Sequence, residues 1–149
     1  MKNYIRFSPN LRKWFYGIFG LLFLSGFLWI VVHNFLAGAD DFDAPQSFFK
    51  TWLLKIHGAG AMASLVIFGV LIPSHMRRGW QQNRNRTTAV VMILACFLLI
   101  VSGYALYYCG SEELRLFVSS FHSWVGCVLP LLLIWHIARG RKSNSAPRA

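Results

Sequence analysis

Residues 14–36 read WFYGIFGLLFLSGFLWIVVHNFL, a run of 23 residues that contains no Lys, Arg, Asp or Glu. A helix needs about 20 predominantly apolar residues to cross roughly 30 Å of hydrocarbon, so this run is long enough to span a membrane. Three further apolar stretches follow, at about residues 48–72, 88–108 and 117–137. All four are predicted to be helices, because a helix satisfies its own backbone hydrogen bonds in lipid.

The composition of the whole chain supports this interpretation. Of its 149 residues, 56% are hydrophobic and 13% are charged, whereas an ordinary soluble domain has about 25% charged residues. The formal net charge of +10, combined with this apolarity, indicates a membrane protein with basic flanks and not a nucleic-acid-binding protein. None of the three cysteines has a C-x-x-C spacing, which argues against a disulfide scaffold, a zinc site and covalent haem attachment. The sequence therefore predicts an all-α integral membrane four-helix bundle.

The charged residues sort by side of the membrane. With four crossings, one side carries 12 of the 15 basic residues: Lys2, Arg6, Arg12, Lys13, Arg77, Arg78, Arg84, Arg86, Arg139, Arg141, Lys142 and Arg148. The other side carries all five acidic residues: Asp40, Asp41, Asp43, Glu112 and Glu113. Because Lys and Arg concentrate in cytoplasmic loops, both termini are predicted to be cytoplasmic.

This topology divides the chain into three parts. Residues 1–13 form a cytoplasmic tail, residues 14–138 form the transmembrane bundle, and residues 139–149 form a basic cytoplasmic tail. Membrane lipid is the expected environment, and the basic flanks suit anionic headgroups at the inner leaflet. No nucleic-acid partner is expected.

All five histidines, His33, His57, His75, His122 and His136, lie in a predicted span or within a few residues of its end. Ionisable residues inside a bilayer are costly and indicate a function by default. The second and fourth spans run in the same direction, so they place His57 and His122 near the outer boundary and His75 and His136 near the inner one. In each span the two histidines are separated by nearly a whole number of helical turns and so share one face.

Two imidazoles on facing helices supply the axial ligation that a haem iron needs. Gly60 and Gly126 follow His57 and His122 on nearly the same face, where small residues would let a flat macrocycle approach. Cations for haem propionates are available at both ends: Arg77, Arg78 and Arg139 inside, and Lys50, Lys55 and Arg115 outside. Pro73 lies just before His75 and predicts an interruption of regular helix there.

The segments HGAGAMASLVIFGVLIPSH (residues 57–75) and HSWVGCVLPLLLIWH (residues 122–136) resemble those of prokaryotic di-haem b-type cytochromes. These include the cytochrome b subunits of hydrogenases and formate dehydrogenases and the four-helix core of cytochrome b in quinol-oxidising complexes. The histidine spacing on the fourth span matches that core, and the spacing on the second span is longer by four residues, about one turn.

The resemblance implies two non-covalent b haems, an outer one ligated by His57 and His122 and an inner one ligated by His75 and His136. It implies a subunit of the bacterial inner membrane that relays electrons between a quinone pool and a redox partner subunit with haem or iron–sulfur centres. We expect no catalysis by this chain alone, because the cofactor carries the chemistry and the bundle sets its position and potential.

Two other functions are compatible with parts of the sequence. A haem-free anchor or assembly subunit of a larger complex would suit the small size, but it leaves the matched histidine pairs unexplained. A metal or proton transporter is less well supported, because no Asp or Glu lies within a span and ion pathways often use carboxylates. His33 has no obvious partner: it would replace His57, contact a quinone, or lie passively at the interface.

Overall fold

The computed structural model describes residues 9–36, 45–82 and 85–145. Within these ranges every regular element is a helix and no strand occurs, which confirms the predicted all-α fold. Four helical segments are long and apolar enough to cross a membrane: Pro9–Phe35, Phe48–Gln81, Arg86–Tyr108 and Glu112–Lys142. The chain is therefore a multi-pass membrane protein whose helices contact lipid.

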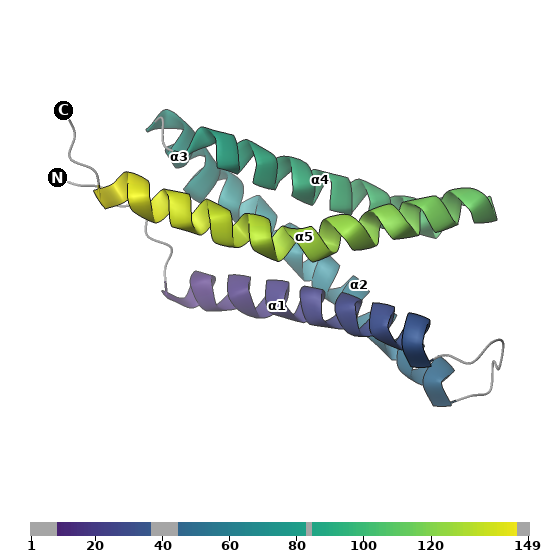
Figure 1. Cartoon of the computed structure of the whole chain (residues 1–149). Coiled ribbons are helices and arrows are strands. Elements are labelled where there is room, and N and C mark those ends of the chain that lie inside the picture. The colour runs from purple at the N-terminus through teal and green to yellow at the C-terminus, as the bar shows by residue number, and fades with distance from the viewer. Residues whose placement is uncertain (1–8, 37–44, 83–84, 146–149) are drawn as a thin grey trace. The chain divides into compact units, whose positions relative to one another are not determined.

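Two compact units make up the chain, Met1–His75 and Met76–Ala149, and each contains one pair of long helices (Figure 1). The elements in chain order are α1 (Pro9–Val31), the π-helix η1 (Val32–Leu36), α2 (Pro45–Leu71), the π-helix η2 (Ile72–Met76), α3 (Arg77–Gln81), α4 (Arg86–Tyr108) and α5 (Glu112–Ser145). We call α1 with α2 the first hairpin and α4 with α5 the second hairpin.

The first hairpin packs through small residues on both of its helices. A methyl group placed on Gly60 of α2 would lie 3.3 Å from Cγ of Leu22 on α1, so this glycine lets the two helices approach closely. Ser25 of α1 is buried at 3% exposure, and Leu53 and Ile67 of α2 are buried as well.

The second hairpin also packs through small residues. The residues that α4 buries are small: Thr88, Ala95, Cys96 and Ser102. The turn before α4 ends at Asn85, whose φ of 50° is left-handed, a conformation that asparagine tolerates better than most residues. The Asn85 side chain donates through Nδ2 to the His136 carbonyl at 3.1 Å, which ties the start of α4 to the far end of α5.

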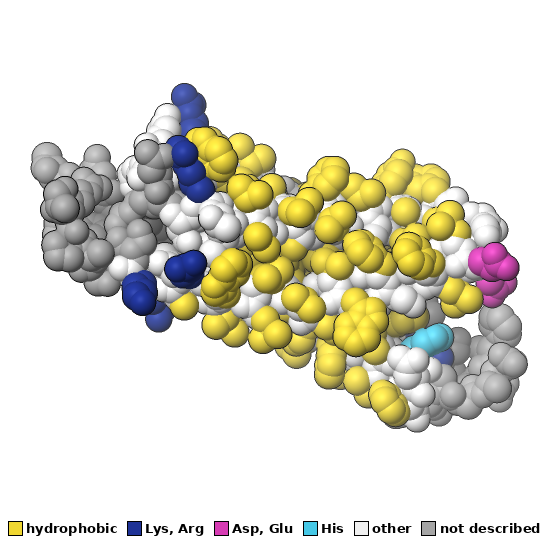
Figure 2. Space-filling view, turned by 45° about the horizontal axis from the view of Figure 1, so that its top comes forward, with side chains coloured by type: hydrophobic (Ala, Val, Ile, Leu, Met, Phe, Trp, Pro, Cys, Tyr) yellow, Lys and Arg dark blue, Asp and Glu magenta, His cyan; other side chains and the backbone are white. Residues whose placement is uncertain are grey.

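Helix α5 is longer than the apolar span predicted for it. It begins at Glu112 and continues through the charged residues after position 138 to Ser145, because Arg and Lys are good helix formers. Its acidic first turn and basic C-terminal end both suit the helix dipole. Figure 2 shows apolar side chains over much of the visible surface of the chain.

Both π-helices contain a histidine, His33 in η1 and His75 in η2. In η2 the cause is Pro73, which has no N–H to donate and whose ring clashes with the preceding turn. The predicted interruption of regular helix before His75 is thus confirmed. Nothing in the sequence of η1 explains its π-helical turn.

Candidate functional site

His57 lies on α2 and turns its imidazole toward α1. Its Nδ1 atom is 3.0 Å from the carbonyl oxygen of Leu22 and 3.2 Å from Oγ of Ser25. The Ser25 hydroxyl donates to the carbonyl of Leu21 at 2.7 Å, one turn back on its own helix. One ring nitrogen of His57 is therefore held by two acceptors on the neighbouring helix.

These contacts determine the tautomer of His57. A carbonyl oxygen only accepts, so Nδ1 carries the proton that is donated to Leu22. The single proton of Ser25 is used toward its own helix, so its oxygen also accepts from Nδ1. An imidazolium inside a span is costly, and in the neutral ring the other nitrogen, Nε2, is then the basic one. A neutral imidazole can bind a metal through its basic nitrogen, which here is Nε2.

His122 on α5 has the same arrangement in the second hairpin. Its Nδ1 atom lies 2.9 Å from Oγ of Ser102 on α4. Ser102 is buried at 6% exposure, and its hydroxyl donates to the Leu98 carbonyl at 2.6 Å. The oxygen of Ser102 accordingly accepts from Nδ1 of His122, which leaves Nε2 as the basic nitrogen.

Each of these serines is followed by a glycine that makes room for the ring. A methyl group on Gly26 would lie 3.0 Å from Cε1 of His57, and one on Gly103 would lie 3.3 Å from Cε1 of His122. Such contacts are tighter than those normally found in a packed interior. Each histidine ring therefore occupies space that a side chain larger than that of glycine would need. We call Ser25 with Gly26, and Ser102 with Gly103, the two Ser-Gly seats.

The two seats belong to a longer packing pattern that both hairpins share. The first helix of each hairpin carries Leu-x-x-Ser-Gly, at residues 22–26 and at residues 99–103. The leucine of each pattern faces a glycine of the second helix: a methyl group on Gly60 would lie 3.3 Å from Leu22, and one on Gly126 would lie 3.9 Å from Leu99. Gly60 and Gly126 thus face the first helix of their own hairpin, and the approach of a macrocycle to them stays a prediction.

His136, on the same helix as His122, also meets a hydroxyl of α4. Its Nδ1 atom lies 2.8 Å from Oγ1 of Thr88, which is almost fully buried at 1% exposure. Thr88 also donates to the Asn85 carbonyl at 3.3 Å, and Asn85 in turn binds the His136 carbonyl. The C-terminal half of α5 is therefore fixed to α4 at this histidine.

The remaining predicted site residues lie at the ends of their helices. His75 is half-buried in η2, and Arg77 and Arg78, at the start of α3, are exposed. His33 is exposed, and its ring stacks on Trp29 at 4.6 Å between centroids with an interplanar angle of 9°. Ligation by these histidines and pairing of Arg77 and Arg78 with propionates stay predictions.

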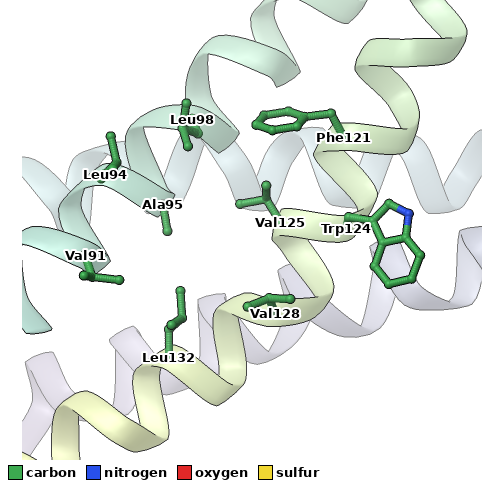
Figure 3. A pocket seen from close by; sticks show the side chains of 9 residues that line it. All are labelled: Val91, Leu94, Ala95, Leu98, Phe121, Trp124, Val125, Val128 and Leu132. Carbon is green, nitrogen blue, oxygen red and sulfur yellow. The ribbon is translucent and has the colours of Figure 1, made fainter.

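An apolar groove of about 360 Å³ runs between α4 and α5. Figure 3 shows that its lining consists of apolar and aromatic side chains, and that the indole of Trp124 points away from α4. Neither His122 nor His136 lines it. The groove suits an acyl chain better than a polar headgroup, and it is separate from the histidine contacts.

Ser25 and Thr88 contact histidines but were not among the residues predicted from the sequence. For Ser25 the available signal was the Ser-Gly pair, which occurs twice in the chain, at residues 25–26 and 102–103. Thr88 belongs to no such pair. Over the parts of the chain that the structure describes, no three His, Cys, Asp or Glu side chains come together as a metal site. A haem iron takes only two axial ligands from the protein, because its porphyrin supplies the other four.

The arrangement can supply nitrogen ligands. Two half-buried histidines, one in each hairpin, are held as the tautomer whose Nε2 is basic, and a third histidine meets a buried threonine. Comparisons of the chain with protein-family models, with curated proteins and with solved structures find no match.

Proposed function

We propose that this chain is a membrane-embedded electron-transfer subunit that binds two non-covalent b haems. His57 and His122 are the proposed axial ligands of an outer haem, and His75 and His136 those of an inner haem. Haem supplies one-electron chemistry when bound, while the chain binds it, orients it and sets its surroundings.

The matching surroundings of His57 and His122 carry this proposal. A histidine that merely links two helices needs one hydrogen bond, and either tautomer would serve. Here both rings have the same nitrogen held by the neighbouring helix, in two separate hairpins, and both rest against a glycine. A hydrogen bond on one ring nitrogen that orients the other toward a metal is typical of ligating histidines.

The proposed redox partners are a quinone pool and a partner subunit with haem or iron–sulfur centres. The proposed location is the bacterial inner membrane with both termini cytoplasmic. Helix α5 supports this orientation: it has Glu112 and Glu113 in its first turn and Arg139, Arg141 and Lys142 near its other end, and basic residues favour the cytoplasmic side.

Haem content tests the proposal. The full chain, expressed with added haem and purified in detergent, is expected to show the reduced spectrum of a low-spin b cytochrome and two haems per chain by pyridine haemochrome. His122→Ala is expected to lose the outer haem and His136→Ala the inner one. His33→Ala is the matched control, since His33 is exposed and is expected to leave both haems in place.

Three results would change the assignment. A single haem in the wild type would refute the inner site. Loss of a haem in His33→Ala but not in His57→Ala would move an outer ligand to His33. Absence of haem would overturn the proposal and favour the haem-free anchor subunit.

A further inference from the structure

We propose that Ser25 and Ser102 are positioning residues that hold His57 and His122 in the Nδ1-protonated form and so reserve Nε2 for the outer haem iron. This inference rests on the proposed function, which supplies the haem. The inference assigns to two serines, neither of which would touch the iron, a measurable effect on haem binding and on the haem midpoint potential.

Each serine forms the middle of a directed hydrogen-bond chain. In the first hairpin, His57 Nδ1–H donates to Ser25 Oγ, and the Ser25 hydroxyl donates to the Leu21 carbonyl. In the second, His122 Nδ1–H donates to Ser102 Oγ, and Ser102 donates to the Leu98 carbonyl. The direction cannot reverse without sacrificing the bonds of 2.7 and 2.6 Å to these carbonyls, which have no proton to give.

This chain has an electronic consequence for a ligated ring. A hydrogen bond donated from Nδ1 makes the imidazole a more basic ligand, and a more basic ligand stabilises ferric iron more than ferrous iron. Each serine is therefore expected to lower the haem midpoint potential and to strengthen haem binding. A serine that only bends or packs its own helix would do neither.

Ser64 on α2 provides the matched control. Its hydroxyl donates to the Ala61 carbonyl, three residues back, at 2.7 Å, an intrahelical bond of the same length as the one from Ser25 to Leu21, four residues back. Ser64 is half-buried. Among the described residues, Ser64 forms no hydrogen bond with a histidine. Ser64→Ala thus removes the intrahelical bond alone, whereas Ser25→Ala and Ser102→Ala remove that bond together with the acceptor of a histidine.

The experiment compares Ser25→Ala, Ser102→Ala and Ser64→Ala in the full chain with haem bound. Haem affinity, redox titration and the EPR spectrum of the ferric form are measured for each. Ser25→Ala and Ser102→Ala are expected to weaken haem binding roughly 10- to 100-fold, to raise the midpoint potential of one haem and to alter its EPR signal. Ser25→Ala belongs near the lower end of that range, because the Leu22 carbonyl still accepts from His57.

Two further measurements complete the test. Ser25→Thr and Ser102→Thr keep a hydroxyl and are expected to restore the wild-type potential. ¹⁵N spectra of histidine-labelled protein without haem are expected to show Nδ1-protonated rings for His57 and His122.

The outcomes separate this inference from the proposed function. Haem-loaded Ser25→Ala and Ser102→Ala variants that match Ser64→Ala in potential and EPR signal would overturn the inference and leave the cytochrome intact. A wild type without haem would overturn the cytochrome, and the ¹⁵N spectra would still decide the role of the serines. Nε2-protonated rings of His57 and His122 in these spectra would overturn the proposed role of the serines.

Discussion

The imidazole of His57 rests against the backbone of Gly26, so the smallest possible substitution at this glycine tests the geometry of the ring. A methyl group there would approach Cε1 of His57 to 3.0 Å and Nδ1 to 3.2 Å. To relieve this contact the ring must rotate away from α1. Rotation lengthens the hydrogen bond from Nδ1 to the Leu22 carbonyl.

We expect Gly26→Ala to weaken haem binding about fivefold. This factor corresponds to about 1 kcal/mol, the net free energy of one hydrogen bond. Haem titration of the purified variant measures it. Gly20→Ala on the same helix is the control, because a methyl group there would have no side chain or neighbouring helix of the described residues within 4 Å. Equal affinity in the two variants would show that the Ser-Gly seat does not hold the ligating ring.

The histidines could be found from the sequence, but their partners could not. A histidine in an apolar span is conspicuous by its type and its depth, which are properties of the sequence alone. Ser25 is 32 residues away from His57, and Thr88 is 48 residues away from His136. Which serine or threonine meets which ring depends on the rotation and register of two helices, and lipid-exposed helices with apolar residues on every side show little periodicity to reveal it.

At the scale of the helices, the four spans were predictable because bilayer thickness sets a minimum apolar length. The helix ends were less predictable from the sequence than the spans. Helix α1 begins at Pro9, before the predicted span, and α5 continues beyond its span to Ser145. Beyond the hydrocarbon region a helix needs no apolar residues, so hydropathy does not mark its end. Pro73 predicted the interruption of regular helix that the structure shows as η2, whereas no residue in the sequence of η1 predicted its π-helical turn.

Pro73 gives a prediction that belongs to its helix. Replacing it with alanine restores a backbone donor and permits a regular α-helix through His75. A π-helical turn holds more residues per turn than an α-helical one, so this change rotates His75 relative to His57. We expect Pro73→Ala to keep the outer haem and lose the inner one, which halves the haem content per chain.

Pro130 on α5 is the matched control for that experiment. Helix α5 stays α-helical through Pro130, so Pro130→Ala is expected to keep both haems. Spectra and pyridine haemochrome of the two variants provide the comparison. Two haems in Pro73→Ala would show that the register of η2 is irrelevant to cofactor binding.

For the molecule as a whole, the predicted orientation places one end of each hairpin in the cytoplasm, and a single thiol at each end tests it. Cys109 is half-exposed directly after α4, at the end predicted to be outside. Gly79 lies in α3 next to Arg77 and Arg78, at the end predicted to be inside, and a side chain at this position has open space.

A membrane-impermeant thiol reagent is expected to modify Cys109 in right-side-out vesicles, and Cys109→Ser is expected to abolish this labelling. In the Cys109→Ser background, Gly79→Cys is expected to react in inverted vesicles only. The physical reason is the cytoplasmic preference of the basic residues beside Gly79. The reverse pattern would invert the predicted topology.

In each hairpin the outer histidine is contacted by its own neighbouring helix: His57 by Leu22 and Ser25 of α1, and His122 by Ser102 of α4. The two helices of each pair are consecutive in the chain, so each ring is oriented as soon as its hairpin has formed during membrane insertion. The conformational entropy of the ring is then lost when the hairpin forms and not when the cofactor binds. A site that is pre-organised in this way favours tight binding of the cofactor. A chain cut between α3 and α4 would therefore yield two fragments that each carry an oriented ligand, and haem would act as the bridge that joins them.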